Sequence, residues 1–188
     1  MQYPTPVTDL VSRLADPRRR DVAFRELVAT HGPALHAHLL RMLGSAADTD
    51  DVLQNTFVRV YRGLDGFRAE SQLTTWLYRI ATNEALGWLR AARRRRERIA
   101  SRSPEQLSLL HRSADRPFDG EGAQRELLRA LCTLPPKQRA VFSMRYYDDL
   151  PYAEISRVTG TSVGGLKASY HLAAKKIERQ LLHYAAQR

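Results

Sequence analysis

One short stretch, residues 64–88, combines side chains suited to binding single-stranded nucleic acid. Such a site needs rings for stacking on bases, amides or hydroxyls for base edges, and cations for the phosphate backbone. The stretch begins as a turn at Asp65-Gly66 and continues as a helix, and its ring, amide and cationic groups are Phe67, Arg68, Trp76, Tyr78, Arg79 and Asn83. The alternative interpretation is that Phe67, Trp76 and Trp88 are core residues, and Trp88, deep in the helix, is assigned to the core.

A run of arginines follows in the same predicted helix. The sequence "RAARRRRER" covers Arg90 to Arg98. An arginine run is usually a solvated surface, but joined to an aromatic loop it indicates a phosphate-binding flank.

A second segment, "LPYAEISRVTGTSVGGLKASYHLAAKKIERQ", has the spacing of a helix-turn-helix. A first helix from about Tyr152 places Ile155 and Val158 inward, Gly160 allows a tight turn, and Ser162 caps a second helix. The second helix is expected to bury Val163, Leu166 and Tyr170. An ordinary helical hairpin with solvated lysines is the alternative, and the Gly160 turn together with the preceding "LPPKQRAVFSMRYYDDL" favours DNA binding.

The outer face of that second helix offers Lys167, His171 and Lys175 to DNA. Two glycines in its first turn weaken the helix by about 1 kcal/mol each relative to alanine, but they let the backbone approach DNA closely. The face lacks arginine, so bidentate guanine contacts are not available there and Lys167 is the best single candidate for base contact. Lys137 and Arg139, at the start of the preceding helix, are placed to hold phosphates.

The elements that must position these groups are helical. Apolar residues recur at helical spacing through both halves of the 188 residues, and strand-like alternation is nowhere sustained. Gly32-Pro33, Gly44 and Asp65-Gly66 are predicted to separate helices. We predict an all-α protein of two small helical domains, residues 1–96 and 122–188, joined by a flexible linker at 97–121.

Composition agrees with a nucleic-acid partner, and it argues against a disulfide-bonded protein and against a membrane-inserted one. The formal net charge is +10, from 30 Lys plus Arg against 20 Asp plus Glu, which favours a polyanionic partner. A lone cysteine, Cys132, permits no internal disulfide and is expected to be a buried small hydrophobe. No apolar run approaches a membrane span and no signal-peptide pattern is present, so a cytoplasmic location without membrane insertion is expected.

The same residues resemble a known family. "DDVLQNTFVRVYRGLDGFRAESQLTTWLYRIATNEALGWLRAARRR" resembles region 2, and "LPPKQRAVFSMRYYDDLPYAEISRVTGTSVGGLKASYHLAAKKIE" resembles region 4, of the extracytoplasmic-function group of bacterial RNA polymerase sigma factors. The order, the linker and the length also match that group, and the resemblance covers nearly the whole chain from about Val22.

The resemblance implies roles for individual residues. Asp51 and Gln54 are expected to dock on the clamp helices of the polymerase largest subunit, with Phe57 in the core. The loop "FRAES" is expected to capture a flipped base of the −10 promoter element, at a cost of a few kcal/mol that a snug pocket offsets. The implied −10 residues are Phe67, Arg68, Glu70, Ser71, Thr74, Trp76, Arg79 and Asn83, and the implied −35 residues are Lys137, Arg139, Ser162, Lys167, His171 and Lys175.

The implied function is a sigma factor that binds core polymerase and directs promoter recognition and DNA opening. Its implied partners are core RNA polymerase, through the clamp helices and the flap of the second-largest subunit, promoter DNA and an anti-sigma factor. A free-standing helix-turn-helix regulator is the alternative. An enzyme is disfavoured, because His31, His36 and His38 suit no zinc motif and no nucleophile motif or phosphate-cradling loop is present, so we expect no catalytic residue, metal or cofactor.

Overall fold

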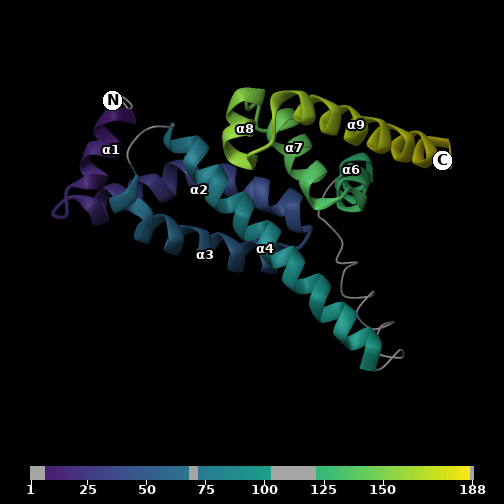
Figure 1. Ribbon diagram of the computed structural model, residues 1–188, viewed down its shortest axis with the longest axis horizontal. Helices are drawn as coiled ribbons and strands as arrows, with labels where there is room; N and C mark the ends of the chain where they lie inside the picture. Colours follow the sequence, from purple (N-terminus) through teal and green to yellow (C-terminus); the bar gives the residue numbers. More distant parts are fainter. Residues whose placement is uncertain (1–6, 68–71, 103–121, 187–188) are drawn as a thin grey trace.

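The computed structural model describes residues 7–67, 72–102 and 122–186, and within these ranges every regular element is a helix. Figure 1 shows two groups of helices packed against each other, α1 to α4 and α6 to α9. The all-α prediction is confirmed. The first group consists of α1 (Val7–Ala15), α2 (Arg20–Leu43), α3 (Ala46–Gly63), the 3-10 turn η1 (Leu64–Gly66) and α4 (Leu73–Arg102). The second consists of α6 (Gly122–Thr133), α7 (Pro136–Tyr146), α8 (Tyr152–Thr159) and α9 (Val163–Ala186).

Two of the predicted helix stops are confirmed, and one is wrong. Gly44 ends α2 in the left-handed conformation at φ 72°, with its N–H donating to the Leu40 carbonyl at 2.8 Å. Leu64–Gly66 forms the turn η1. Pro33, however, lies inside α2. Although proline removes one helical hydrogen bond, the buried residues on both sides of it, such as Leu27 and Leu35, keep the helix continuous.

The first group is organised around α2 and α4. α2 packs on both α3 and α4, and the 3.6-residue period brings the large apolar side chains of these helices into one core. The fully buried members of that core include Leu27, Leu35, Leu39, Met42, Val60 and Leu77. This core fixes the rotation of α4 about its axis, and therefore fixes which of its residues face solvent.

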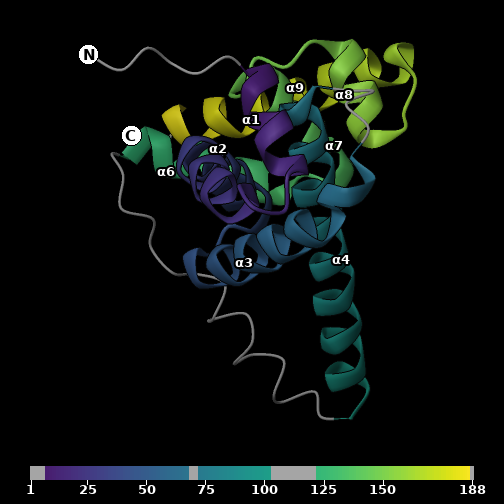
Figure 2. The same cartoon turned by 90° about the vertical axis from the view of Figure 1, so that its left-hand side faces the viewer.

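The C-terminal part of α4 extends away from the rest of the molecule (Figure 2). The helix continues to Arg102, six residues beyond the predicted end of the first domain at 96. The predicted linker, 97–121, therefore begins as helix, and its remaining residues 103–121 lie outside the described part of the chain.

The two groups of helices share one interface. α8 packs on α4, and α7 and α6 pack on α2. Val141, Met144 and Ile155 of the second group belong to the same buried cluster as Leu39 and Leu77 of the first. A smaller cluster, which includes Leu131, Phe142 and Ile177, lies within the second group. In this structure the two halves are therefore in direct contact.

Two side chains at this interface differ from the sequence predictions. Cys132, predicted to be buried, is exposed, and its sulfur lies so near the end of α2 that a Cβ added at Gly44 would be 2.7 Å from it. Arg139, predicted to face DNA, is buried and only 6% exposed. Its guanidinium donates to the Met42 carbonyl of the other half at 2.6 Å, and to the Leu134 and Cys132 carbonyls of its own half.

We predict that Arg139→Met destabilises the protein by about 3 kcal/mol, because a buried cation and the carbonyls it satisfies lose their hydrogen bonds. In a chain of this size that loss lowers the melting temperature by about 10 °C in thermal unfolding followed by circular dichroism. Arg129→Met is the matched control, since the side chain of Arg129 is 70% exposed. Equal melting temperatures for the two variants would show that Arg139 does not hold the halves together.

Candidate nucleic-acid interface

One exposed stripe of α4 contains residues predicted to read DNA. Trp76, Arg79 and Asn83 are spaced three and four residues apart, so they share one face of the helix, and Leu77 and Ala81 occupy the buried face. Arg79 and Asn83 are exposed, while Thr74 and Trp76 are half-buried. The structure therefore presents a ring, a cation and an amide in line along the helix.

Phe67 and Trp76 lie together at the start of this stripe. Their ring centroids are 4.8 Å apart with an interplanar angle of 38°. A Cβ added at Gly63 would lie 3.1 Å from the Trp76 ring, so the glycine makes room for the indole. Both rings are half-buried and pack against the core. Arg68, Glu70 and Ser71, the other predicted loop residues, lie outside the described residues.

The predicted helix-turn-helix is formed by α8 and α9. Gly160 has φ 69°, and the Ser162 hydroxyl accepts a hydrogen bond from the Gly165 N–H at 3.3 Å, capping α9. Leu166 is fully buried, and Tyr170 is half-buried and stacks on Phe142 with centroids 5.3 Å apart. Val163, predicted to be buried, is 39% exposed, because Leu166 alone of the first turns of α9 points into the core.

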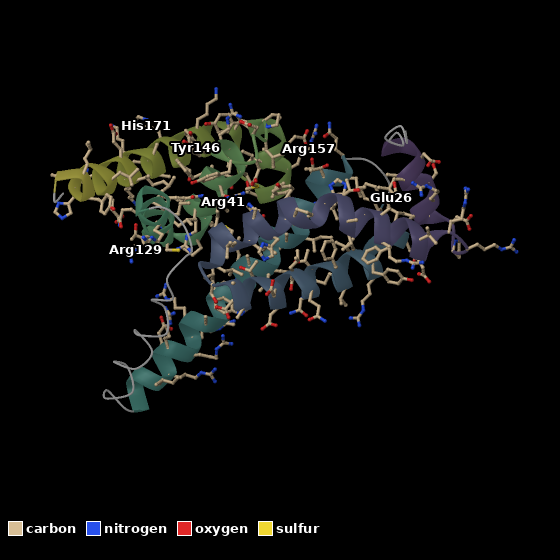
Figure 3. All side chains as sticks on the ribbon, turned by 180° about the vertical axis from the view of Figure 1, so that it is seen from behind. Glu26, Arg41, Arg129, Tyr146, Arg157 and His171 are labelled. Carbon is tan, nitrogen blue, oxygen red and sulfur yellow. The ribbon has the colours of Figure 1, made fainter. Side chains whose placement is uncertain are left out.

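The outer face of α9 carries the predicted −35 residues. Lys167, His171 and Lys175 follow one another at four-residue steps and are all exposed, as are Ser162 and Lys137. Figure 3 shows His171 extending from α9 away from the rest of the molecule. Arg139 does not join them, since its guanidinium is buried among backbone carbonyls, and its assignment to phosphate binding is wrong in this arrangement.

The predicted docking residues lie on α3, on the side away from the core. Asp51 and Gln54 are exposed, and Val58, one turn further on, is 43% exposed. Phe57 is half-buried against the core, with its ring edge-on to Phe24 at 6.2 Å. α3 therefore offers a mixed polar and apolar surface that no described element covers.

A buried polar cluster between the halves was not predicted. Asp148, 8% exposed and located after α7, accepts a hydrogen bond from Arg41 Nη2 at 2.5 Å and from His38 Nδ1 at 3.2 Å. Arg41 Nε also donates to Ser143 Oγ at 2.6 Å, and His38 Nε2 lies 3.1 Å from Thr82 Oγ1 of α4. Figure 3 shows Arg41 between α2 and the second group of helices. The only signal in the sequence was a histidine on the buried side of α2.

Two tyrosines beside this cluster are also shielded from solvent. Burial, followed by the nearby Asp148 carboxylate, raises the pKa of Tyr78 well above its ordinary range. Burial also raises the pKa of Tyr147, and the Arg41 guanidinium lies 4.5 Å from the centre of its ring. A second contact joins the halves at the start of α4, where the Thr75 hydroxyl donates to Glu154 at 2.6 Å. We call the contacts of Asp148, Arg41 and His38 the polar joint.

Metal-binding clusters and membrane-spanning helices are both absent from the described ranges. No three His, Cys, Asp or Glu side chains gather there in a way that could hold a metal ion. None of the described helices is long and apolar enough to cross a bilayer.

Comparison with protein families matches both halves. Residues 27–95 match Sigma-70 region 2, and residues 124–177 match Sigma-70 region 4. The chain is 31% identical over 185 residues to the ECF RNA polymerase sigma factor SigG of Mycobacterium tuberculosis, covering 87% of this chain and 50% of that protein. It spans about half the length of this relative. It is 32% identical over 167 residues to the ECF RNA polymerase sigma-E factor of Haemophilus influenzae, covering 85% of this chain and 87% of that protein.

Solved structures give the same fold. The sigma factor RpoE, crystallised with the anti-sigma factor NepR from Bartonella quintana, matches with a TM-score of 0.67 at 20% identity, over 84% of this chain and 96% of that one. CnrH in complex with the cytosolic domain of CnrY matches with a TM-score of 0.66 at 26% identity, over 92% of this chain and 95% of that one.

We predict that Asp148→Asn lowers the free energy of unfolding by about 2–3 kcal/mol, because it leaves the buried Arg41 and His38 without a charged partner. Asp149→Asn is the matched control, since Asp149 is the next residue and exposed, and asparagine tolerates its φ of 50°. Chemical denaturation measures both variants. An equal, small loss of unfolding free energy in both variants would contradict the burial of Asp148 in the polar joint.

Proposed function

Since the chain belongs to the ECF group of RNA polymerase sigma factors, we propose that it binds core RNA polymerase and directs it to promoters, where it helps to open the DNA. It acts as a binding and positioning protein, not as an enzyme, and works in the cytoplasm with the polymerase. One observation carries the proposal. The exposed stripes of α4 and α9, one in each matched region, consist of the side chains that promoter recognition requires.

The two stripes suit different forms of DNA. The Phe67–Trp76 pair, with Arg79 and Asn83 beyond it, offers ring faces and edges, an amide and a cation for an unpaired strand. The α9 stripe, on a capped helix that follows a tight turn, offers lysines and a histidine to a duplex groove. A sigma factor needs both kinds of surface, because it recognises one promoter element as duplex and the other as it opens.

A free-standing helix-turn-helix regulator is the alternative function. It would use α9 alone, and the ring pair and stripe of α4 would then have no ligand. Tight, sequence-specific binding of duplex DNA without polymerase would favour that alternative. The sigma factor assignment predicts weak binding of little selectivity in the same gel-shift assay.

The described arrangement keeps the two DNA surfaces close together. Glu154 of α8 is bonded to Thr75, next to Trp76, and Lys167 follows Glu154 by 13 residues of helix, turn and helix. Lys167 therefore lies at most about 40 Å from the start of α4. Sigma factors of this group are expected to bind elements about 16 base pairs apart, which is roughly 55 Å of duplex. The two halves must separate for both stripes to reach their elements at once.

The partners follow from the surfaces left free. We assign Asp51 and Gln54 of α3 to the clamp helices of the largest polymerase subunit, and region 4 to the flap of the second-largest. An anti-sigma factor is a further proposed partner, and CnrH, which is 26% identical to this chain, was solved in complex with a second protein, the cytosolic domain of CnrY. A protein that binds both halves when they are in contact would keep the stripes too close to function.

Run-off transcription tests the proposed function. Purified core polymerase with this chain is expected to give discrete transcripts from a set of genomic fragments, and core alone is not. If no fragment yields a transcript that depends on the chain, the sigma factor assignment fails.

We predict that Asp51→Ala weakens binding to core polymerase about tenfold, the effect of losing one charge-assisted hydrogen bond. Asp50→Ala is the matched control, because Asp50 is also exposed but points to another side of α3, towards His36 at 3.3 Å. Fluorescence anisotropy with labelled protein measures both affinities.

The reciprocal variant is Phe67→Ala, which removes one ring of the pair on region 2. It is expected to keep native affinity for core polymerase and to lose most run-off transcript. If Phe67→Ala weakens core binding as much as Asp51→Ala does, the pair is structural and the two surfaces are not separate.

A further inference from the structure

Helix α1 lies outside both matched regions, which begin at residues 27 and 124. Its apolar side chains Leu10 and Leu14 are nevertheless buried in the core of the first group of helices. Arg13 of α1 also donates to Glu26 of α2, with Nη1 and Oε2 2.8 Å apart. Figure 1 shows α1 at the end of the molecule where α2 begins and α3 ends. α1 is therefore fixed beside η1, the turn that leads into Phe67.

One arginine joins α1 to η1. Arg20, the first residue of α2, donates through Nε to the Leu14 carbonyl at 3.1 Å and through Nη2 to Asp65 Oδ1 of η1 at 2.5 Å. Leu14 is in the last turn of α1, where helical carbonyls need partners from outside the helix. The Arg18 N–H, four residues on, donates to the Asp16 carboxylate at 3.0 Å and not back along the helix. A single guanidinium therefore caps α1 and holds η1.

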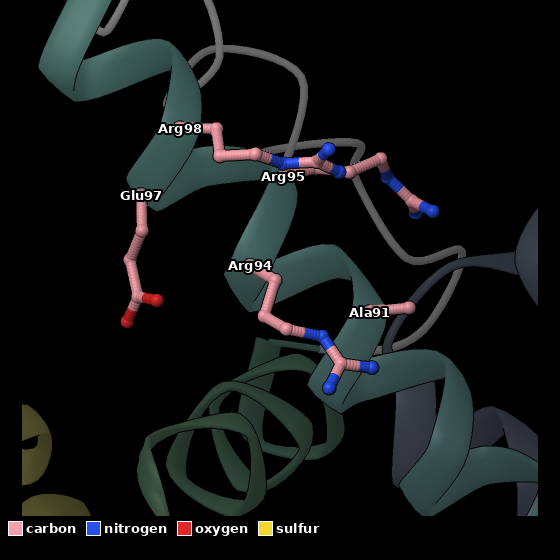
Figure 4. Close-up of a pocket in the computed structure, with 5 residues that line it drawn as sticks. All are labelled: Ala91, Arg94, Arg95, Glu97 and Arg98. Carbon is pink, nitrogen blue, oxygen red and sulfur yellow. The ribbon is translucent and has the colours of Figure 1, made fainter.

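The setting of Arg20 differs from that of an ordinary surface arginine. Figure 4 shows Arg94, Arg95 and Arg98 extending outward from the last turns of α4, around a hollow lined by residues of this helix. The side chain of Arg20, by contrast, is 17% exposed and connects three elements. Its partner Asp65 is 72% exposed, so water screens the ion pair and its contribution to the free energy of unfolding is small. The pair is better suited to fixing a position than to stabilising the fold.

The next residue of α2 holds the chain just before η1. Asp21 Oδ1 accepts a hydrogen bond from the Tyr61 hydroxyl, near the end of α3, at 2.7 Å. The Tyr61 ring also lies edge-on to Phe24 of α2, with centroids 5.0 Å apart. The end of α3 is thus attached to α2 independently of Arg20. The contact between Arg20 and Asp65 therefore acts on the turn that follows.

The position of η1 determines where the Phe67 ring lies. Phe67 follows η1 directly, and its N–H donates to the Leu64 carbonyl at 3.1 Å. Leu64 holds the inner side of the turn, because its side chain is buried in the core. Asp65 is on the outer side, and its bond to Arg20 attaches that side to α1 and α2. The backbone from which the ring extends is therefore held on both sides.

We propose that Arg20 is a positioning residue for promoter opening, which attaches η1 to the end of α1 and so holds the Phe67 ring where an unpaired base of the −10 element stacks on it. Arginine suits this role, because its planar fork donates in two directions at once, whereas the ammonium group of lysine is a single point. Stacking on a base requires a ring in a fixed place. This inference rests on the proposed function, because Arg20 acts through a ring assigned to promoter DNA.

Two substitutions of opposite charge test the role of Arg20. Arg20→Met removes a positive charge and Asp65→Asn removes a negative one, but both break the same contact. Each variant is assembled with core polymerase, and opening is followed by 2-aminopurine fluorescence in the −10 element of a promoter fragment that the native chain transcribes. We expect each to slow opening about fivefold, the effect of losing one partly shielded ion pair. The double variant is expected to be no slower than either single variant, because the two residues act through one contact.

Charge attraction to DNA predicts a different pattern. It would make Asp65→Asn open the promoter faster, because that variant is more positive than the native chain. Arg18→Met is the matched control, since Arg18 is exposed in the same turn and loses the same charge as Arg20→Met. It is expected to change the opening rate by less than about twofold. Equal slowing by Arg18→Met and Arg20→Met, or faster opening by Asp65→Asn, overturns the positioning role.

A second cycle tests whether Arg20 acts through Phe67. In a Phe67→Ala background, Arg20→Met is expected to slow opening no further, because the ring that it positions is gone. Independent, additive slowing overturns the proposal.

Measurements on the free protein separate positioning from folding. Arg20→Met is expected to melt within about 3 °C of the native chain and to bind core polymerase with native affinity. A larger drop in melting temperature, or a loss of core affinity that matches the loss of opening, assigns Arg20 to the fold and overturns the proposal. If the native complex itself opens and transcribes no promoter fragment, it is the proposed function that fails.

Discussion

The arrangement of the two halves depends on the buried carboxylate of Asp148, which is bound by Arg41 and His38 from the other half of the chain. A carboxylate with 8% exposure is tolerable only while these partners are present. The net stability from a buried ion pair is nevertheless small, because the cost of removing both charges from water nearly offsets their attraction. When the halves separate, each charge regains its water. A polar joint therefore fixes the relative position of the halves without making their association permanent.

α4 contributes to the core, to the interface between the halves and to the exposed stripe, through three different faces. One face of α4 is buried in the core of region 2, through Leu77 and Ala81. A second face, with Thr75, Tyr78 and Thr82, meets region 4 and the joint. The third face carries the stripe from Trp76 onwards and remains exposed beside region 4. Because the three faces are fixed by one helical phase, separating the halves uncovers the second face without disturbing the first or the third.

The sequence was sufficient to predict the helices and the residues on their exposed stripes, because these depend on local periodicity and caps. It was not sufficient to predict the contacts between halves. Arg139 was expected to face DNA because it begins a basic helix, but its guanidinium reaches carbonyls on both sides of the interface. Asp148 and His38 are 110 residues apart in the chain, and no periodic pattern relates such positions. Pro33 was read as a stop, although burial on both sides of it keeps α2 continuous.

The distance between the two halves shows most directly whether they separate on the promoter. After Cys132→Ala removes the native thiol, Thr30→Cys on α2 and Glu178→Cys on α9 provide two exposed positions for fluorescent labels, away from the proposed DNA and polymerase surfaces. Energy transfer between the labels is then measured in the free protein and in its complex with core polymerase and promoter DNA. We predict one short distance in the free protein and a distance longer by at least about 20 Å in the complex, because the promoter elements lie roughly 55 Å apart. The same short distance in both states would contradict it.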